Sequence, residues 1–379
     1  MKLNLAIDAI GIKHSGGATV LTDVLNAATA DSRIGNISVF CSPRARRLFN
    51  LPASDKIHQI ECRVSEANRI YRLWWIENRL RCEVQRRGGD VLLCLTGIGS
   101  ARGYPPHVTM IQQSLPFFPE ISCRTGSFEW LRMSVMLRAM RRSCTSSQHV
   151  IVQTPTMRKR VAEEFRLPPE RISVILPAVS DLPPPIIPSE RLATMRATNT
   201  GLRLLYVGNQ SAYKNVELVV RAFGKLRTLL NGLKLFLTWP PDHPVCRSDG
   251  IVGLGYLQGA VLREAYELAT VLVMPSLMET VGFPMLEAMS VGTPVIAADL
   301  PYAHDVCGEA AVFFDPLDTD DLAAKAADLL GSQQLQRDLI SRGYNVIQRR
   351  RAERPYEDII DILAAVAYKH GVSGIRRAG

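Results

Sequence analysis

Short apolar runs alternate with stretches of helical spacing along the first half of the chain. The apolar runs at 3–7, 37–40, 91–95, 108–111, 150–152 and 172–176 predict strands. Between them, apolar residues three or four positions apart predict helices at 18–28, at about 65–87 and at 126–144. Because strands that are apolar on both faces lie in sheets covered by helices on each side, a parallel sheet is expected here.

The second half repeats this alternation. Strands are predicted at 204–207, 233–237, 271–274, 295–298 and 311–314. Helices are predicted at 216–230, 261–269, 284–291, 319–331, 333–350 and, as an amphipathic last segment, 356–368. The fold class expected is therefore α/β, with two doubly wound, Rossmann-like domains facing a central cleft.

A proline cluster at 177–185 separates the two halves, and it can continue neither a helix nor a central strand. We interpret it as the start of an interdomain linker; the alternative is a long surface loop inside one domain. The expected division is residues 1–182, a linker at 183–200, a second domain at 201–350, and a C-terminal helix in 351–379 that packs back on the first domain.

Charge is distributed unevenly over the 379 residues. The formal net charge is +9, but residues 1–200 hold 27 basic and 16 acidic residues, against 18 and 20 in the remainder. A basic half suits nucleic acid, an anionic membrane or phosphorylated substrates.

No uncharged window is long enough for a transmembrane helix, and the first residues do not form a signal peptide. Eight scattered cysteines without a C-x-x-C pair indicate reduced thiols in the cytoplasm.

The segment 275–295 carries the most informative chemistry. A predicted strand ends at Pro275, a loop follows through Gly282, and Pro284 suits the first turn of a helix that Gly292 would end. Ligands bind at the carboxyl ends of strands in such sheets, and a helix N-terminus favours phosphate. Free N–H groups are expected near Phe283, Met285 and Leu286.

Two carboxylates flank this predicted helix start. Glu279 precedes the helix and Glu287 lies about one turn into it, so both can border one pocket. Carboxylates beside a phosphate site suit the hydroxyl groups of a sugar better than the phosphate itself. The alternative is a solvated loop residue together with a glutamate that favours the helix dipole.

This segment closely resembles the signature of glycosyltransferase family 4, retaining enzymes of GT-B fold that use nucleotide sugars. The residues in register are Ser276, Glu279, Gly282, Pro284, Glu287, Ala288, Met289, Gly292, Pro294 and Val295, while Thr280 and Val281 replace the common Gly and Phe. The resemblance implies that Glu287 holds the ribose hydroxyls and that Glu279 contacts the transferred sugar. It further implies that the backbone around Gly282, Phe283, Pro284 and Met285 cradles the diphosphate.

A second loop, at 206–215, follows the first strand of the second domain. Its Lys214 can neutralise a diphosphate as that leaving group departs. The family commonly has Arg, four residues and Lys here; Lys214 matches the Lys, whereas Asn209 stands in the place of the Arg. Gly208 and Asn209 are donor-binding candidates, and an exposed position at a helix start is the alternative for Lys214.

The loop after the first strand of the chain is also glycine-rich. Gly16 and Gly17 allow a ligand to approach the backbone closely and are donor-binding candidates, with a plain turn as the alternative. Lys13 and His14 are candidates for acceptor or phosphate contacts. Family members often carry His after the strand at 108–111, where this chain has Gln112; Gln can hydrogen-bond a sugar but cannot shuttle a proton.

No metal or other cofactor is expected. The D-x-D sequence at Asp318–Asp320 lies just before a predicted helix, where an N-cap followed by acidic residues is the better interpretation. The GT-B resemblance also implies independence of metals, with the nucleotide sugar as co-substrate.

Two basic helical segments, 69–81 and 130–142, combine arginines with Trp and other apolar residues. Such helices suit a membrane interface, and they equally suit ordinary helices that cover a sheet, with Trp74 and Met136 in the core. The family resemblance favours the membrane, because many members glycosylate lipid-linked acceptors. Nucleic acid is not an expected partner, since no recognised binding motif is present.

The family resemblance therefore implies a retaining hexosyltransferase, mannosyltransferase-like, that acts in the synthesis of cell-surface polysaccharide such as O-antigen, capsule or exopolysaccharide. Glu279 and Lys214 are the catalytic candidates. The expected location is the cytoplasm, peripheral to the inner face of the membrane, where a glycan or lipid-linked acceptor docks on the basic half. Two alternatives remain: a catalytically weak GT-B protein that serves as a partner or regulatory subunit, and a nucleotide-sugar epimerase.

Overall fold

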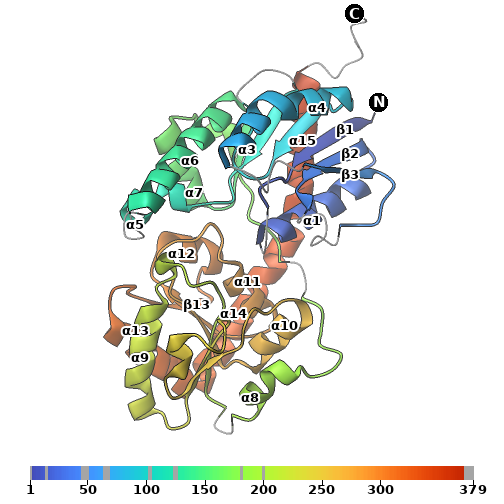
Figure 1. Ribbon diagram of the computed structural model, residues 1–379. Coiled ribbons are helices and arrows are strands. Elements are labelled where there is room, and N and C mark those ends of the chain that lie inside the picture. Colours follow the sequence, from blue (N-terminus) through green and yellow to red (C-terminus); the bar gives the residue numbers. More distant parts are fainter. Residues whose placement is uncertain are drawn as a thin grey trace, which may run out of the picture. The chain divides into compact units, whose positions relative to one another are not determined.

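The computed structural model describes residues 2–12, 16–43, 51–62, 69–100, 105–122, 127–179, 182–198 and 201–370. The chain forms two compact units (Figure 1). Unit 1 comprises Met1–Pro119, Gly126–Pro177 and Arg354–Gly379, and unit 2 comprises Glu120–Thr125 and Ala178–Glu353. The C-terminal segment thus belongs to the unit that contains the N-terminus.

Unit 1 is built on a seven-stranded sheet with all neighbouring strands parallel, in the order β3-β2-β1-β4-β5-β6-β7. The order reverses between β1 and β4, which makes their carboxyl ends a topological switch point. The strands are β1 (Leu3–Asp8), β2 (Ile34–Cys41), β3 (Ile57–Glu61), β4 (Val91–Cys94), β5 (His107–Met110), β6 (His149–Val152) and β7 (Ile172–Val174).

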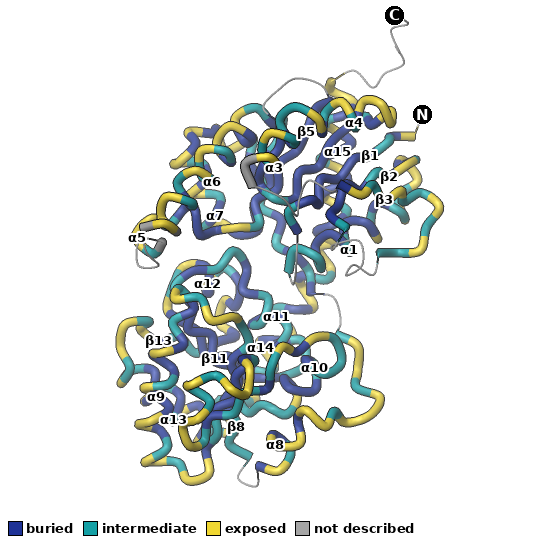
Figure 2. The backbone as a smooth tube through the Cα atoms, viewed as in Figure 1, coloured by how far each residue is buried: buried dark blue, intermediate teal, exposed yellow. Residues whose placement is uncertain are grey.

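Helices cover this sheet, and their apolar faces supply much of its core. In Figure 2 the strands of this unit are mostly buried, whereas α6 turns an exposed face outward. The helical elements from 16 to 171 are α1 (Gly16–Ala30), α3 (Arg69–Trp75), the π-helical turn η2 (Ile76–Leu80), α4 (Arg81–Arg86), η3 (Leu115–Phe117), α5 (Pro119–Ser122), α6 (Ser127–Ser146), α7 (Pro155–Phe165) and η5 (Pro169–Arg171).

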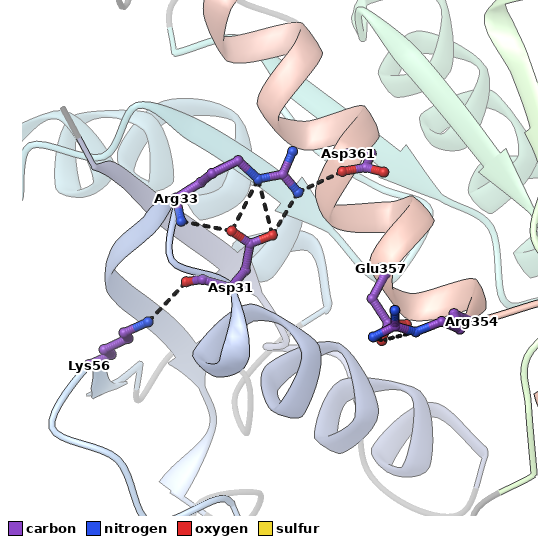
Figure 3. Close-up of polar contacts among 6 residues, drawn as sticks. All are labelled: Asp31, Arg33, Lys56, Arg354, Glu357 and Asp361. Atoms are coloured by element: carbon purple, nitrogen blue, oxygen red, sulfur yellow. Dashed lines mark hydrogen bonds and ion pairs between the residues drawn. The ribbon is translucent and has the colours of Figure 1, made fainter.

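The last helix, α15 (Pro355–Lys369), packs against α1 in unit 1. Its fully buried residues Ile359, Ile360 and Leu363 make an apolar face. At the rim, the Arg33 guanidinium joins Asp361 of α15 to Asp31, with Nη2 2.6 Å from an oxygen of each carboxylate (Figure 3). Because the Arg33 and Asp361 side chains are solvent-exposed, the buried apolar face contributes most of the attachment.

Unit 2 contains a six-stranded sheet, again with all pairs parallel, in the order β10-β9-β8-β11-β12-β13. The order reverses between β8 and β11. The strands are β8 (Arg203–Tyr206), β9 (Lys234–Leu237), β10 (Ile251–Gly253), β11 (Val271–Met274), β12 (Val295–Ala298) and β13 (Ala311–Phe314). Alternate strand residues enter two separate apolar clusters, with Leu205 in one and its neighbour Tyr206 in the other.

Helices complete both clusters of unit 2. The helical elements are η6 (Glu190–Leu192), α8 (Ala193–Arg196), η7 (Ala212–Lys214), α9 (Val216–Leu229), η8 (Pro244–Arg247), α10 (Gly259–Leu268), α11 (Phe283–Ser290), α12 (Pro301–Cys307), α13 (Thr319–Gly331) and α14 (Gln333–Ala352). Within the segment expected as linker, Leu192 and Met195 are fully buried in the core of unit 2. Those residues therefore belong to the packed body of that unit.

The expected fold class of two doubly wound parallel sheets is confirmed. In the described part of the chain, no helix is both long and apolar enough to cross a membrane. One interpretation was wrong: Trp74 is not a core residue, because it is 47% exposed and stacks on Tyr71.

Candidate functional site

The loops after β8 and β11 meet at the switch point of the unit 2 sheet. The N–H of Leu277, just beyond β11, donates a 2.8 Å hydrogen bond to the carbonyl of Tyr213, in the loop that follows β8. Ligands bind at the carboxyl ends of strands where the strand order reverses. The two loops that the sequence singled out are therefore joined where this fold class places a ligand.

Lys214 and Glu279 form an ion pair between these loops. Both side chains are largely buried, 11% and 14% exposed respectively. Burial alone would lower the pKa of Lys214, but the Glu279 carboxylate and Tyr213 outweigh burial and raise that pKa above its ordinary value. The site thus holds a charged ammonium group beside a carboxylate, and the exposed helix-start interpretation of Lys214 was wrong, because Lys214 is buried.

Local backbone geometry holds Lys214 in place. It ends the short helix η7, and Asn215 then adopts a left-handed conformation with φ of 53° before α9 begins. The Asn215 amide donates a 2.9 Å hydrogen bond to the carbonyl of Pro316, which fixes this turn against the loop after β13. An Asn at this position is consistent with its tolerance of the left-handed region.

Gly282 lies directly before the first residue of α11. Its φ is +73°, a conformation that favours glycine, and a Cβ there would lie 2.6 Å from Cε of Met285, so the end of that side chain would have to shift. Pro284 lies in the first turn of the helix, as expected, and Phe283 packs partly buried against the core. The expected free N–H at Met285 was wrong: it donates to the Gly282 carbonyl at 2.9 Å, because the chain is already turning there.

Glu287 lies on α11 and accepts a 2.7 Å hydrogen bond on Oε2 from the hydroxyl of Tyr266 in α10. Burial raises the pKa of Glu287, and the Tyr266 hydrogen bond opposes that rise. Tyr266 was not predicted from the sequence, because a tyrosine in an amphipathic helix has the pattern of an ordinary core residue. Tyr302 was not predicted either; its hydroxyl donates a 2.7 Å hydrogen bond to the carbonyl of Ser276.

Gly208 and Asn209 are engaged with neighbouring protein groups. The Gly208 N–H donates to Thr238 Oγ1 at 3.0 Å, and its carbonyl accepts from Trp239 Nε1 at 3.1 Å. Asn209 turns its side-chain oxygen back to the N–H of Ser211, at 3.0 Å. Asn209 therefore stabilises its own turn, which an Arg could not do in the same way.

In unit 1, the glycine-rich loop leads into α1, which begins at Gly16. A Cβ on Gly17 would lie 3.5 Å from Oε1 of Gln112, so these two residues are neighbours at the end of the sheet. The Gln112 side chain also donates a 3.0 Å hydrogen bond to the carbonyl of Leu95. Lys13 and His14 lie outside the described residues.

Asp8, the last residue of β1, is a buried carboxyl that the sequence analysis did not single out. Its Oδ1 accepts a 3.0 Å hydrogen bond from the Ile10 N–H, while Oδ2 is buried and has no partner among the described residues. Burial raises its pKa to about 6, against opposing effects of that hydrogen bond and of Arg72. Its position directly after an apolar run was the one sequence feature that could have indicated a buried carboxyl group at the end of a strand.

The acidic segment before α13 has the expected capping role. Asp318 accepts hydrogen bonds from the N–H groups of Asp320 and Asp321, at 2.8 and 3.2 Å. Among the residues that the structure describes, no three His, Cys, Asp or Glu side chains are grouped so that they could hold a metal ion. The Lys214–Glu279 pair gives the unit 2 site groups for charge neutralisation and hydrogen bonding.

Two family models match the chain in succession. Residues 15–181 match "Glycosyltransferase Family 4" and residues 201–332 match "Glycosyl transferases group 1". The O-antigen chain mannosyltransferase B of Escherichia coli is 27% identical over 206 residues, which are 51% of this chain and 54% of that protein. The chain spans about half the length of the first curated relatives it matches.

Solved structures share the fold over nearly the whole chain. WaaG, a glycosyltransferase involved in lipopolysaccharide biosynthesis, superimposes with a TM-score of 0.73 at 15% identity, covering 95% of this chain and 99% of WaaG. Anabaena HepE in complex with UDP and glucose matches with a TM-score of 0.69 at 15% identity, covering 96% of this chain and 100% of HepE. With a family match in each half and this fold throughout, the chain belongs to glycosyltransferase family 4, whose members have the GT-B fold.

Proposed function

We propose that this chain is a retaining glycosyltransferase that moves a hexose-type sugar from a nucleotide sugar to a lipid-linked or saccharide acceptor. The observation that carries the proposal is the buried Lys214–Glu279 pair at the switch point of the unit 2 sheet. A fixed positive charge there can stabilise the departing nucleoside diphosphate. Glu279 can accept hydrogen bonds from the hydroxyl groups of the sugar.

The proposed transfer breaks the bond between the anomeric carbon and the diphosphate oxygen. The acceptor oxygen forms the new bond to that carbon, and its hydroxyl proton passes to the departing diphosphate. Lys214 and the N-terminus of α11 favour the negative charge that develops on the leaving group. Glu287 holds the ribose hydroxyls, so the donor is anchored at both ends of its diphosphate.

The relatives support a role in cell-surface polysaccharide such as O-antigen, capsule or exopolysaccharide. The matched E. coli protein acts on the O-antigen chain, WaaG takes part in lipopolysaccharide biosynthesis, and HepE binds UDP and glucose. These functions favour a nucleoside diphosphate donor and a glycan or lipid-linked acceptor for this chain. The donor base, the sugar and the linkage are left open.

The surface of α6 supports a location at the inner face of the cytoplasmic membrane. Phe128, Leu131 and Val135 are 80%, 53% and 48% exposed, and their spacing of three and four residues places them on one face of the helix. Arg138 and Arg142 continue that face. Exposed apolar residues next to arginines suit the headgroup region of an anionic bilayer.

A thermal-shift screen of the purified chain with GDP, UDP, dTDP and ADP tests the donor site. A ligand that binds the folded state raises its apparent stability. We expect at least one of the four to raise the Tm, and Lys214→Ala to abolish that rise. If none of the four raises the Tm of the unaltered chain, the proposed function is wrong.

A partner or regulatory subunit without turnover is the second candidate, and the closed turn at Asn209 favours it. Because the Asn209 side chain is used within its own loop, the donor lacks the cationic contact that family members commonly have there. If the chain binds a nucleotide sugar but neither hydrolyses it nor transfers the sugar, the subunit role is correct. If the chain shows transfer activity and both Glu279→Ala and Lys214→Ala abolish it, the chain is an active transferase and the subunit role is wrong.

A further inference from the structure

Among the described residues, Tyr266 is the one whose side chain donates a hydrogen bond to the Glu287 carboxylate. The bond joins the hydroxyl of Tyr266 to Oε2 at 2.7 Å. No described residue donates a hydrogen bond to Oε1, and Glu287 is only half-buried. One carboxylate oxygen is thus held by the protein, and the other is available to a ligand.

Tyr266 cannot follow Glu287 if the carboxylate moves. The tyrosine is completely buried in the apolar core of unit 2. Its own carbonyl accepts hydrogen bonds from Thr293 Oγ1 at 2.7 Å and from the Ala269 N–H at 3.0 Å, which fix its backbone from two sides. The hydroxyl is therefore a stationary donor, and it selects one rotamer of Glu287.

A stationary donor matters because a glutamate side chain is otherwise mobile. Ordering such a side chain on ligand binding costs conformational entropy, and a contact already made in the free protein removes that cost. Two adjacent hydroxyls of a ribose can donate to one carboxylate, provided that its free oxygen faces them. Tyr266 supplies this condition before the nucleotide arrives.

We propose that Tyr266 is a positioning residue for ribose recognition: its hydroxyl orients the Glu287 carboxylate so that the nucleotide's ribose hydroxyls find it preformed. This inference rests on the proposed function, in which Glu287 binds the ribose. The role is exerted through Glu287, so Tyr266 touches neither the sugar nor the phosphates. Burial raises the pKa of Tyr266 well above its ordinary value, so the hydroxyl keeps its proton and stays a donor.

The test compares a nucleoside diphosphate with its 2′,3′-dideoxy counterpart, which lacks both ribose hydroxyls. The probe is whichever of GDP, UDP and ADP, which carry both ribose hydroxyls, stabilises the full chain most. Tyr266→Phe keeps the ring and removes the hydroxyl. We expect the Kd of the natural nucleotide to rise about tenfold, as for loss of a hydrogen bond to a charged group, while the Kd of the dideoxy nucleotide stays within about twofold. In turnover, KM for the donor rises and kcat stays unchanged.

The matched control is Tyr356→Phe. Tyr356 of α15 also hydrogen-bonds a carboxylate, that of Asp23, but it lies in unit 1. This variant loses the same kind of buried hydrogen bond and is expected to keep the natural-to-dideoxy ratio of Kd values. A natural-to-dideoxy Kd ratio that rises equally in both variants overturns the positioning role.

A double-mutant cycle with Glu287→Gln separates the positioning role from the proposed function. If Tyr266 acts through Glu287, the double variant binds the natural nucleotide no more weakly than Glu287→Gln alone. Additive losses overturn the inference, and so does an unchanged ratio in Tyr266→Phe. If no nucleotide stabilises the unaltered chain, the proposed function fails together with this inference, whereas normal nucleotide binding with an unchanged ratio overturns only the role of Tyr266.

Discussion

Lys214 and Glu279 couple the stability of unit 2 to the chemistry proposed for it. Removing the ammonium group in Lys214→Ala leaves the Glu279 carboxylate buried without its ion-pair partner. We expect the free energy of unfolding to fall by about 3 kcal/mol. We also expect kcat/KM for transfer to fall by about 10²- to 10³-fold, because a preorganised charge at the leaving group is lost. Urea unfolding and a transfer assay measure the two effects.

Lys225→Ala is the control, since Lys225 pairs with Asp320 on the exposed surface of the same unit. Exposed pairs contribute at most about 1 kcal/mol, so both stability and activity should be nearly unchanged. The double variant Lys214→Met/Glu279→Gln should recover part of the stability without recovering activity. Full activity in Lys214→Ala would contradict the assignment of the leaving-group charge.

Asp8 is a residue at which pH and stability are linked. Its ordinary pKa is 3.8, and burial raises it to about 6 in the folded chain. Between these two values the folded state holds a proton that the unfolded chain has released, so stability falls as the pH rises through this window. Above pH 6 the buried charge costs about 3 kcal/mol relative to the neutral acid.

Asp8→Asn should therefore stabilise the chain at pH 7.5 and leave it nearly unchanged at pH 4. An Asn keeps an oxygen that can accept the Ile10 N–H, so the loop after β1 retains its hydrogen bond. Urea unfolding of both proteins between pH 4 and 7.5 measures the effect. Parallel curves for the two proteins across this range would show that Asp8 does not titrate there.

At the scale of elements, the start of α11 depends on Gly282. Alanine at that position must adopt a φ of +73° and place its Cβ against Met285, so Gly282→Ala should cost about 1–2 kcal/mol of stability. Because the strain is relieved by shifting the first turn of α11, donor binding should weaken as well. Thermal unfolding with and without nucleotide measures both.

Gly224→Ala provides the matched substitution in the same unit. Gly224 lies inside α9, and a Cβ there would meet nothing within 4 Å. Alanine favours the helix by about 0.5–1 kcal/mol, so this variant should be slightly more stable and should bind nucleotide normally. Equal behaviour of the two variants would mean that Gly282 has no special backbone role.

The elements that the sequence predicted best are the fully buried ones. The expected strands at 271–274, 295–298 and 311–314 agree with β11, β12 and β13 residue for residue, because continuous apolar runs leave little ambiguity. The edge strands β3 and β10 were missed. β3 reads Ile-His-Gln-Ile-Glu and is half exposed, so its composition resembles a loop.

The helix α7 was missed although its signals are present: Thr154 caps it and Pro155 opens its first turn. At the site, a motif of adjacent residues placed Glu279 and Glu287 near one helix start. The ion pair with Lys214 joins residues 65 positions apart, and the Tyr266 contact joins two helices. Neither contact follows from a regular spacing of residues along the chain, so neither can be predicted without the packed fold.

At the scale of the whole molecule, the excess positive charge lies in the half that does not carry the Lys214 site. Residues 1–200 hold 27 basic and 16 acidic residues, and α6 adds an exposed apolar face to part of that charge. The unit 2 site achieves its electrostatics with one buried lysine and a helix N-terminus. Arg138 and Arg142 of α6 are exposed and can meet another partner, and the exposed aromatics beside them favour an anionic bilayer over a folded polyanion.

Sedimentation with vesicles tests this surface. We expect the chain to bind vesicles of phosphatidylcholine with one third phosphatidylglycerol more strongly than vesicles of phosphatidylcholine alone, and less strongly as salt is raised. The double variant Phe128→Ser/Leu131→Ser removes apolar contact with the bilayer. The double variant Arg138→Glu/Arg142→Glu reverses two charges, and each arginine near an anionic surface contributes about 1 kcal/mol of binding free energy. Both pairs should weaken binding at least tenfold. Arg337→Glu on α14 of unit 2 is the control; unchanged binding of both α6 variants would exclude α6 as the membrane surface.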